Sequence, residues 1–188
     1  MSETEIRNYA IARGFHPRTL EHWLRWESAD RDALGEIAQA LKIGENHLRD
    51  LLDWLDEIAL RDRSRIRDVL GGKAMTDIVT DPRLGRADKL KRVKEQVRRL
   101  RLPRLAETED AIRNKIQALK LVPEIHLSVP AGLEEGRLQV EFKATSHDEL
   151  KRMVAKLSEA AETNSVREIF ELLAGRQATR NQNTTSLK

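Results

Sequence analysis

The chain has 188 residues, of which 35% are charged and only 4% are aromatic. Many charged and few aromatic side chains favour a mostly helical protein over a large sandwich or barrel. Because the chain has no cysteine, disulfide scaffolds, thiolate metal sites and cysteine nucleophiles are excluded. Its length predicts two small domains, since domains cluster near roughly 100–150 residues.

Positive charge is concentrated in the middle of the chain. Residues 71–104 contain 11 basic and 4 acidic side chains, whereas residues 1–70 contain 11 and 14 and residues 105–175 contain 9 and 13. Such a basic segment is typical of a chain that contacts a polyanion. A helix face exposed to solvent gives the same pattern and is the alternative interpretation.

An internal repeat opens the chain, with a helix, a turn and a second helix in each copy, offset by 28 residues. In the first copy Gly14 suits the left-handed end of a helix, and Pro17 suits the first turn of the next one. Two amphipathic patterns can also coincide through their common period alone. The matched positions are Ala10 and Ala38, Ala12 and Ala40, Phe15 and Ile43, Leu20 and Leu48, Leu24 and Leu52, and Trp26 and Trp54.

The second helix of the first copy is predicted to present a basic outer face. Its apolar residues recur at spacings of three and four, so they share one side and leave the basic residues on the other. Such a helix fits the major groove of DNA, where arginine reads guanine and a small side chain contacts phosphate or a thymine methyl. A helical hairpin that packs on its neighbour is the alternative. The residues predicted to read DNA are Arg18, Thr19, His22 and Arg25.

This stretch of about twenty residues resembles the helix-turn-helix units of regulators and transposases. In those units an alanine, a turn glycine, an apolar turn residue and an Arg-Thr-Leu segment with a tryptophan recur. The resemblance implies sequence-reading contacts from the second helix. The residues that carry it here are Ala10, Gly14, Phe15, Arg18, Thr19, Leu20 and Trp23.

The second copy has the same apolar frame but an acidic outer face. Carboxylates on that face would repel phosphates, so residues 46–57 are interpreted as a scaffold or a surface for a protein partner. His47 and Arg49 are possible backbone contacts of lesser weight. The acidic residues are Asp50, Asp53, Asp56 and Glu57.

A helix after Leu60 is predicted to end at Gly71 and Gly72, which closes a first domain at residues 1–72. Residues 73–104 are predicted to form a connector and a basic amphipathic helix, which Pro103 interrupts. Its apolar seam would bind a partner helix while its cations hold phosphates. A solvated coiled-coil arm and a membrane-surface helix are the alternatives, although the latter lacks anchoring aromatics. The predicted phosphate contacts are Arg83, Arg86, Lys89, Arg92, Arg98, Arg99 and Arg101.

The periodicity changes in residues 105–175, which we predict to be an α-β-β-α module. A helix over about 105–119 precedes alternating apolar residues between 123 and 144, which indicate a β-hairpin. Ser146 and Glu149 form a capping box for the next helix, and a short helix follows over about 165–174. Residues 176–188 lack apolar periodicity and are predicted to be disordered.

This module resembles the C-terminal dimerisation module of the ParB chromosome-partition family. The likeness rests on Leu105, Glu107, Glu109, residues 136–142, Ser146, residues 148–150, Arg152 and Met153. It implies a homodimer that pairs through helices and a shared sheet. The family's nucleotide-binding domain has no counterpart, so CTP hydrolysis is not implied, and the hairpin loop has Leu133, Glu134 and Glu135 in place of DNA-contacting lysines. The implied dimer residues are Leu138, Val140, Phe142, Leu150, Met153, Val154 and Leu157.

The sequence gives no sign of an enzyme, a cofactor or a metal site. Its five histidines lack the spacing that places two ligands on one helix face, and Gly72-Lys73 lacks the rest of a phosphate loop. The N-terminus lacks the features of a signal peptide, and no apolar run is long enough to span a bilayer.

These features lead to one function and one alternative. We expect a mostly α-helical protein with a small α+β C-terminal module. Its expected function is that of a cytoplasmic, nucleoid-associated dimer that binds double-stranded DNA as a ParB-like accessory factor or a transcriptional regulator. The alternative is a helical adaptor for a protein partner, or an RNA-binding protein, that reads no DNA sequence.

Overall fold

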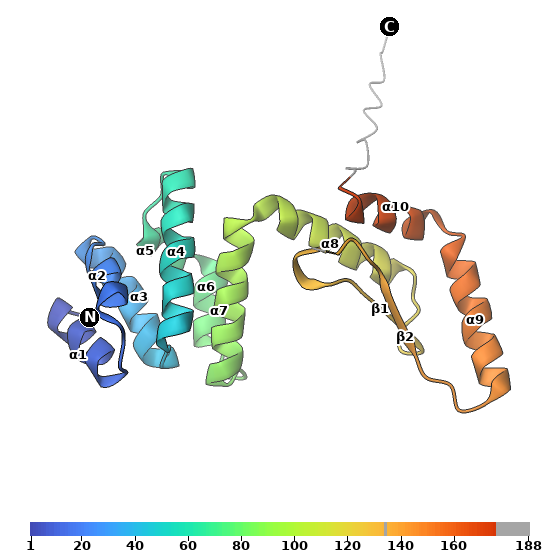
Figure 1. The fold of residues 1–188 in the computed structure, drawn as a ribbon, viewed down its shortest axis with the longest axis horizontal. Coiled ribbons are helices and arrows are strands. Elements are labelled where there is room, and N and C mark those ends of the chain that lie inside the picture. Colours follow the sequence, from blue (N-terminus) through green and yellow to red (C-terminus); the bar gives the residue numbers. More distant parts are fainter. Residues whose placement is uncertain (134, 176–188) are drawn as a thin grey trace, which may run out of the picture. The chain divides into compact units, whose positions relative to one another are not determined.

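The computed structural model describes residues 1–133 and 135–175, which fall into two compact units (Figure 1). Unit 1 is Met1–Pro103 and unit 2 begins at Arg104. The described residues form helices and a single two-stranded sheet, so the predicted fold class is confirmed. The segment predicted to be disordered, 176–188, lies outside the described residues. No helix in the described part of the chain is long and apolar enough to cross a membrane.

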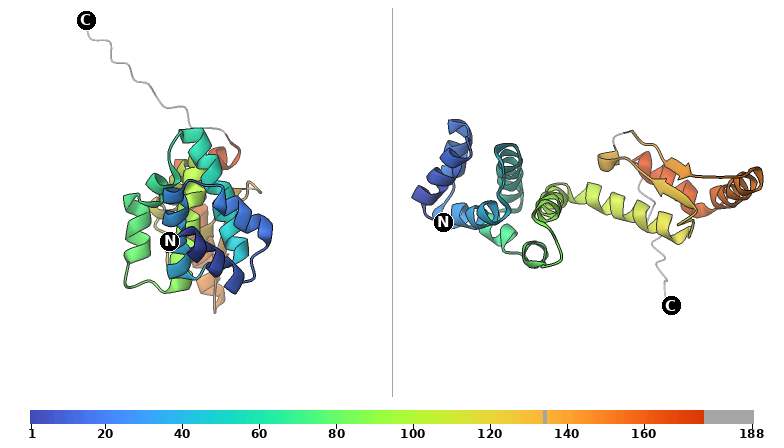
Figure 2. Two further views of the ribbon diagram at one scale, coloured as in Figure 1. Left: turned by 90° about the vertical axis from the view of Figure 1, so that its left-hand side faces the viewer. Right: turned by 90° about the horizontal axis from the view of Figure 1, so that it is seen from below.

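Unit 1 is entirely helical (Figures 1 and 2). Two of its helices differ from the prediction. The helix expected after Leu60 is short because Arg63, in the left-handed region, ends the preceding helix, and the expected connector contains a helix of its own. The helices are α1 Glu3–Ala12, α2 Pro17–Leu24, α3 Ser28–Leu41, α4 Glu45–Asp62, α5 Ile66–Leu70, α6 Lys73–Thr80 and α7 Arg86–Arg101.

The repeat is present in the structure as two turns of the same geometry. Gly14 and Lys42 occupy the left-handed region, with φ of 68° and 51°. The next residue in each copy bonds back to the helix before it: the Phe15 N–H donates to the Ala10 carbonyl at 2.9 Å, and the corresponding bond in the second copy is 3.0 Å. These bonds satisfy carbonyls that a helix end leaves open. The two turns are therefore built alike.

A single core joins the helices of unit 1. Trp23 from α2 and Leu52 from α4 are completely buried in it, and Met75, Val93 and Val97 add side chains from α6 and α7. Segment 73–104, which the sequence sets apart, thus packs on residues 1–72. The apolar seam of α7 was expected to bind a partner helix. In the structure it is covered by its own unit, so this prediction is corrected.

Unit 2 consists of three helices and a hairpin. Pro103 interrupts the helical run as predicted, since Leu102 leaves the helical region and α8 begins at the proline. In the hairpin Ile125 faces Phe142 and Leu127 faces Val140, so these four side chains share one side of the sheet. The elements are α8 Pro103–Ala118, β1 Ile125–Ser128, a short 3₁₀ turn Ala131–Leu133, β2 Gln139–Phe142, α9 His147–Ala161 and α10 Asn164–Leu173.

The core of unit 2 is small. Five residues form its buried cluster, with half-buried neighbours from α8, the hairpin and α9 around them. The predicted cap of α9 is present, because the Ser146 hydroxyl accepts a bond from the Glu149 N–H at 3.1 Å. The buried residues of the cluster are Leu121, Ile125, Leu127, Met153 and Ala160.

Candidate nucleic-acid interface

Thr19 points into the fold, which corrects the outward placement assumed from the sequence. Its side chain is 7% exposed, and its hydroxyl donates to the Glu45 carboxylate of α4 at 2.7 Å. The same carboxylate accepts the backbone N–H of His16 at 2.9 Å. These bonds lower the pKa of Glu45, with the Thr19 hydroxyl as the largest cause. Glu45 therefore joins the first turns of α2 and α4.

His22 also lies against α4 instead of on a free outer stripe. Its Nε2 is 2.6 Å from an oxygen of Asp56, and its Nδ1 is 3.7 Å from Asp53. The Trp26 indole donates to the other Asp56 oxygen at 2.8 Å. With 21% of its side chain exposed, His22 fastens α2 to α4. The sequence pattern missed this because α2 packs on two neighbours, not one.

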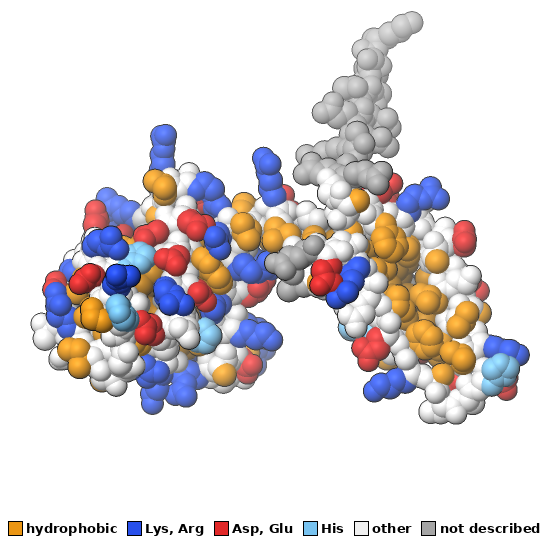
Figure 3. Space-filling model, viewed as in Figure 1, with side chains coloured by type: hydrophobic (Ala, Val, Ile, Leu, Met, Phe, Trp, Pro, Cys, Tyr) orange, Lys and Arg blue, Asp and Glu red, His pale blue; other side chains and the backbone are white. Residues whose placement is uncertain are grey.

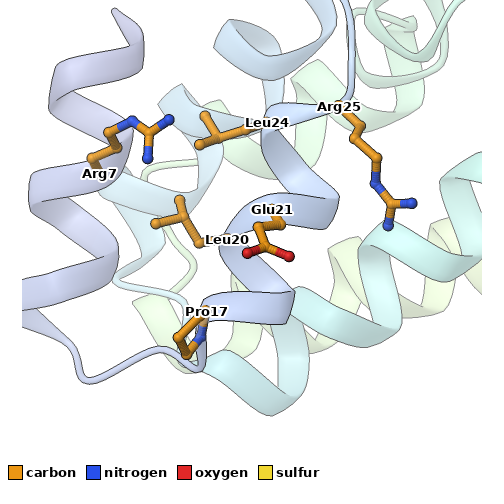
Figure 4. A pocket seen from close by; sticks show the side chains of 6 residues that line it. All are labelled: Arg7, Pro17, Leu20, Glu21, Leu24 and Arg25. Atoms are coloured by element: carbon orange, nitrogen blue, oxygen red, sulfur yellow. The ribbon is translucent and has the colours of Figure 1, made fainter.

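Arg18 and Arg25 are the two predicted DNA-reading residues that are exposed. Figure 4 shows α2 from close by: Leu20 and Leu24 point toward Arg7 of α1, whereas Arg25 extends from the opposite side of the helix. The apolar side borders a hollow of about 380 Å³ between α1 and α2. The outer face of α2 is therefore reduced to two arginines with Glu21 beside them.

Two cations of α7 are held by the acidic face of α4. Lys94 donates to Asp50 at 2.7 Å, and the Arg101 guanidinium donates to Glu57 at 2.5 and 2.9 Å. Both cations approach the ring of Trp54, at 5.3 and 5.8 Å from its centroid. The helices lie side by side and run in the same direction, because partners advance by seven residues on each (Figure 1). Arg101, a predicted phosphate contact, is thus engaged within unit 1.

The other predicted phosphate contacts differ in their availability. Arg83 bonds to Asp81 and holds the pKa of that carboxyl at about 2. Lys89 donates to the Val79 carbonyl at 2.7 Å. Arg98 donates to a carboxylate one turn away on α7, and Arg99 is half-buried. Exposed side chains are found at Arg86 and Arg92.

The structure places further cations where the two matched turns meet. The Arg13 guanidinium donates to the Lys42 carbonyl at 2.7 Å and lies 5.5 Å from the Tyr9 ring centroid. Lys42 and Arg49 are exposed beside them. The sequence offered one signal for Arg49, since the offset of the repeat places it where α2 has Glu21.

The predicted dimer residues of unit 2 separate into buried and exposed sets. Met153 is buried at 2% exposure, whereas Val140, Leu150 and Val154 are 40%, 43% and 51% exposed. Figure 3 shows hydrophobic side chains gathered on the face between the hairpin, α9 and α10. The half-buried members of the set are Leu138, Phe142 and Leu157.

The described side chains offer cations, amides and apolar surfaces as possible ligand contacts. Among the residues that the structure describes, no group of three or more His, Cys, Asp or Glu is arranged to hold a metal ion. Comparisons with protein-family models, with curated proteins and with solved structures find no match for this chain. Its function is therefore inferred from the placement of its own side chains.

Proposed function

We propose that this chain is a double-stranded DNA-binding protein that acts as a homodimer. Unit 1 supplies the DNA contacts and unit 2 supplies the dimer interface. The observation that carries the proposal is the pair of matched helix-turn-helix copies, whose second helices run side by side and leave Arg18 and Arg25 exposed on α2. An exposed helix with arginines at its solvent face fits the major groove.

The exposed cations of α7 support the proposal by adding phosphate contacts. Arg86, Lys91 and Arg92 are exposed, and contacts of this kind raise affinity without reading sequence. Asp88 and Glu95 lie between them on the same helix, which lowers the local positive potential. We therefore assign α7 a supporting part and α2 the reading part.

The exposed apolar face of unit 2 supports a second copy of the chain as partner. Val140 lies on the core side of the hairpin yet is 40% exposed, while Leu127 opposite it is 6% exposed. Leu150 and Val154, one turn apart on α9, extend this apolar surface. A symmetric copy that covers it also provides a second helix-turn-helix unit, as a palindromic DNA site requires.

An adaptor function has less support because the acidic residues of segment 46–57 have partners in unit 1. Asp50 and Glu57 pair with cations of α7, and Asp56 accepts bonds from His22 and Trp26. Little of the acidic charge is left for another protein. Within the DNA-binding class, a ParB-like accessory factor and a transcriptional regulator remain the two candidate roles.

The test is fluorescence anisotropy of the full chain with random duplex DNA over a salt series. We expect the logarithm of the affinity to fall by about 0.9 per phosphate contact for each decade of salt. The double variant Arg18→Ala/Arg25→Ala should weaken binding by more than about tenfold, since arginine contacts to bases contribute about 1–3 kcal/mol each.

The matched control removes two exposed arginines elsewhere, Arg65→Ala/Arg167→Ala, and keeps the net charge equal to that of the test variant. It should bind almost as the parent chain does. If the parent chain shows no binding at low salt, the proposed function is wrong.

A further inference from the structure

We infer that the second helix-turn-helix copy also contacts DNA, through Arg49 with Asn46 and Lys42, and that the two copies form one continuous phosphate-binding surface. This inference rests on the proposed function and extends it. Sequence reasoning assigned residues 46–57 to a scaffold or a protein partner. The structure supports the opposite assignment for the first turn of α4.

The first step is that the two turns lie together. Glu45 accepts bonds from both His16 and Thr19, and Arg13 donates to the carbonyl of Lys42. These three bonds connect the turn and first helical residues of one copy to those of the other. Cations near either turn therefore belong to one end of unit 1.

The second step is that α2 and α4 run in the same direction, with Arg49 beside α2. Thr19 meets Glu45 at the start of both helices, and His22 meets Asp56 further along both. On α4, Arg49 follows Glu45 by four residues and precedes Asp53 by four, so it lies on the side that faces α2. Its side chain is nevertheless exposed.

The third step concerns charge. The carboxylates closest to this end are engaged: Glu45 by its two bonds and Asp50 by Lys94. The positive charges of His16 and Arg49 also contribute to the lowered pKa of Glu45. Exposed cations come from the turns and helix starts of four segments of the chain: Arg13, Arg18, Lys42, Arg49 and Lys91.

This surface has limits that the structure also shows. Glu21 is exposed one turn beyond Arg18 on α2, and Asp53, with 56% of its side chain exposed, follows Arg49 on α4. A phosphate backbone would be repelled by these carboxylates. The surface therefore covers the turns and the first helical turns, and it does not extend along α4.

The chemistry of this surface suits a duplex backbone. Arginine donates two parallel bonds to a phosphate, and a short amide such as Asn46 can bond to phosphate or to a base edge. The offset of the repeat places Asn46 where α2 has Arg18. The second copy thus holds the DNA that the first copy reads.

The experiment compares Arg49→Gln with Arg65→Gln in the full chain, using the same random duplex and salt series. Both arginines are exposed, and Arg65 follows the far end of α4. Loss of one phosphate contact should lower the affinity about tenfold near 0.1 M salt and reduce the salt slope by about 0.9, whereas Arg65→Gln should change neither. The charge-reversed pair Arg49→Glu and Arg65→Glu should show the same contrast more strongly.

Equal affinities for Arg49→Gln and Arg65→Gln, in a chain that binds DNA and is weakened by Arg18→Ala/Arg25→Ala, would overturn this inference and leave the proposed function intact. Failure of the parent chain to bind would overturn both. Circular dichroism and the thermal midpoint check that each variant is folded, which we expect because the replaced side chains are exposed.

Discussion

The two units differ in how much of their apolar surface they cover by themselves. Unit 1 joins buried side chains from α1 to α7 in one core. Unit 2 has a buried cluster of five residues, and several large apolar side chains on its hairpin and helices are about half exposed. Because burial of apolar surface is the main source of folding free energy, unit 1 is complete alone and unit 2 gains from a cover.

Charge does not account for this difference. Unit 1 links its helices through Lys94 with Asp50 and Arg101 with Glu57, and unit 2 does the same through Lys115 with Glu168 and Lys156 with Glu124. Exposed pairs of this kind contribute about 0–1 kcal/mol each. The contrast between the units therefore lies in apolar burial.

The largest expected effect tests the core of unit 1. Leu52→Ala should lower the free energy of unfolding by about 2–5 kcal/mol, because it removes a completely buried side chain and leaves a cavity. Leu60→Ala, on the same helix at 85% exposure, should stay within about 0.5 kcal/mol of the parent chain.

Urea denaturation followed by tryptophan fluorescence measures this effect in unit 1 alone, since the three tryptophans are Trp23, Trp26 and Trp54. Similar losses for Leu52→Ala and Leu60→Ala would contradict a self-sufficient core.

The next effect tests the cover of unit 2. We expect the parent chain to be a dimer at micromolar concentration, and Val154→Asp to raise its dissociation constant at least about tenfold, which is 1.4 kcal/mol. A charge buried without a partner would oppose association. Sedimentation or light scattering measures the mass, and Lys151→Asp is the control, since Lys151 is exposed three residues earlier on α9.

A monomeric mass for the parent chain would contradict the cover by a second copy. Tryptophan fluorescence should be the same in both variants, because it reports unit 1.

The sequence predicted the elements of both units better than their packing. The hairpin, the break at Pro103, the cap at Ser146 and the repeat all follow from local rules about turns and periodicity, and all are present. The helix α6 was missed because a connector with Gly72 before it and Pro82 after it resembles a loop. Local signals define where a helix starts and ends, but not what covers it.

The candidate site was harder to predict for the same reason. Thr19 and His22 were assigned to an outer face by helical spacing, yet both bond to carboxylates of α4. The seam of α7 was assigned to another molecule, yet Val93 and Val97 are buried in unit 1. Spacing along a helix identifies its faces, whereas contacts distant in sequence decide which face is exposed.

A smaller effect tests the join between α4 and α7. In a double-mutant cycle of Arg101→Ala and Glu57→Ala, the coupling free energy should be about 0.5–1 kcal/mol, since the pair is bidentate but partly exposed. The same urea titration measures it. A cycle of Arg101→Ala with Glu36→Ala is the control and should give no coupling. A coupling of zero for the first cycle would mean that apolar contacts alone hold α7 on unit 1.

The smallest effect tests the join between α2 and α4 through its dependence on pH. The pKa of Glu45 is lowered below 4.5 by its bonds to Thr19 and His16, so its carboxylate stabilises the folded chain fully above pH 4.5. That stability is lost as the pH falls through the lower, folded-state pKa. Glu45→Gln should therefore lower the urea midpoint of the tryptophan signal at pH 7, and its difference from the parent chain should shrink below pH 4.5.

Glu36→Gln, at an exposed position of α3, is the control for the loss of one carboxylate and should show a smaller change at pH 7. A difference between Glu45→Gln and the parent chain that stays constant from pH 7 to pH 3 would mean that the carboxylate charge is not what joins the two helices. The matched turns would then be held together by the contacts of Arg13 and Tyr9 with the second turn, because these bonds do not titrate in that range. In that case Arg49 should still bind phosphate, since the placement of α4 beside α2 would not depend on Glu45.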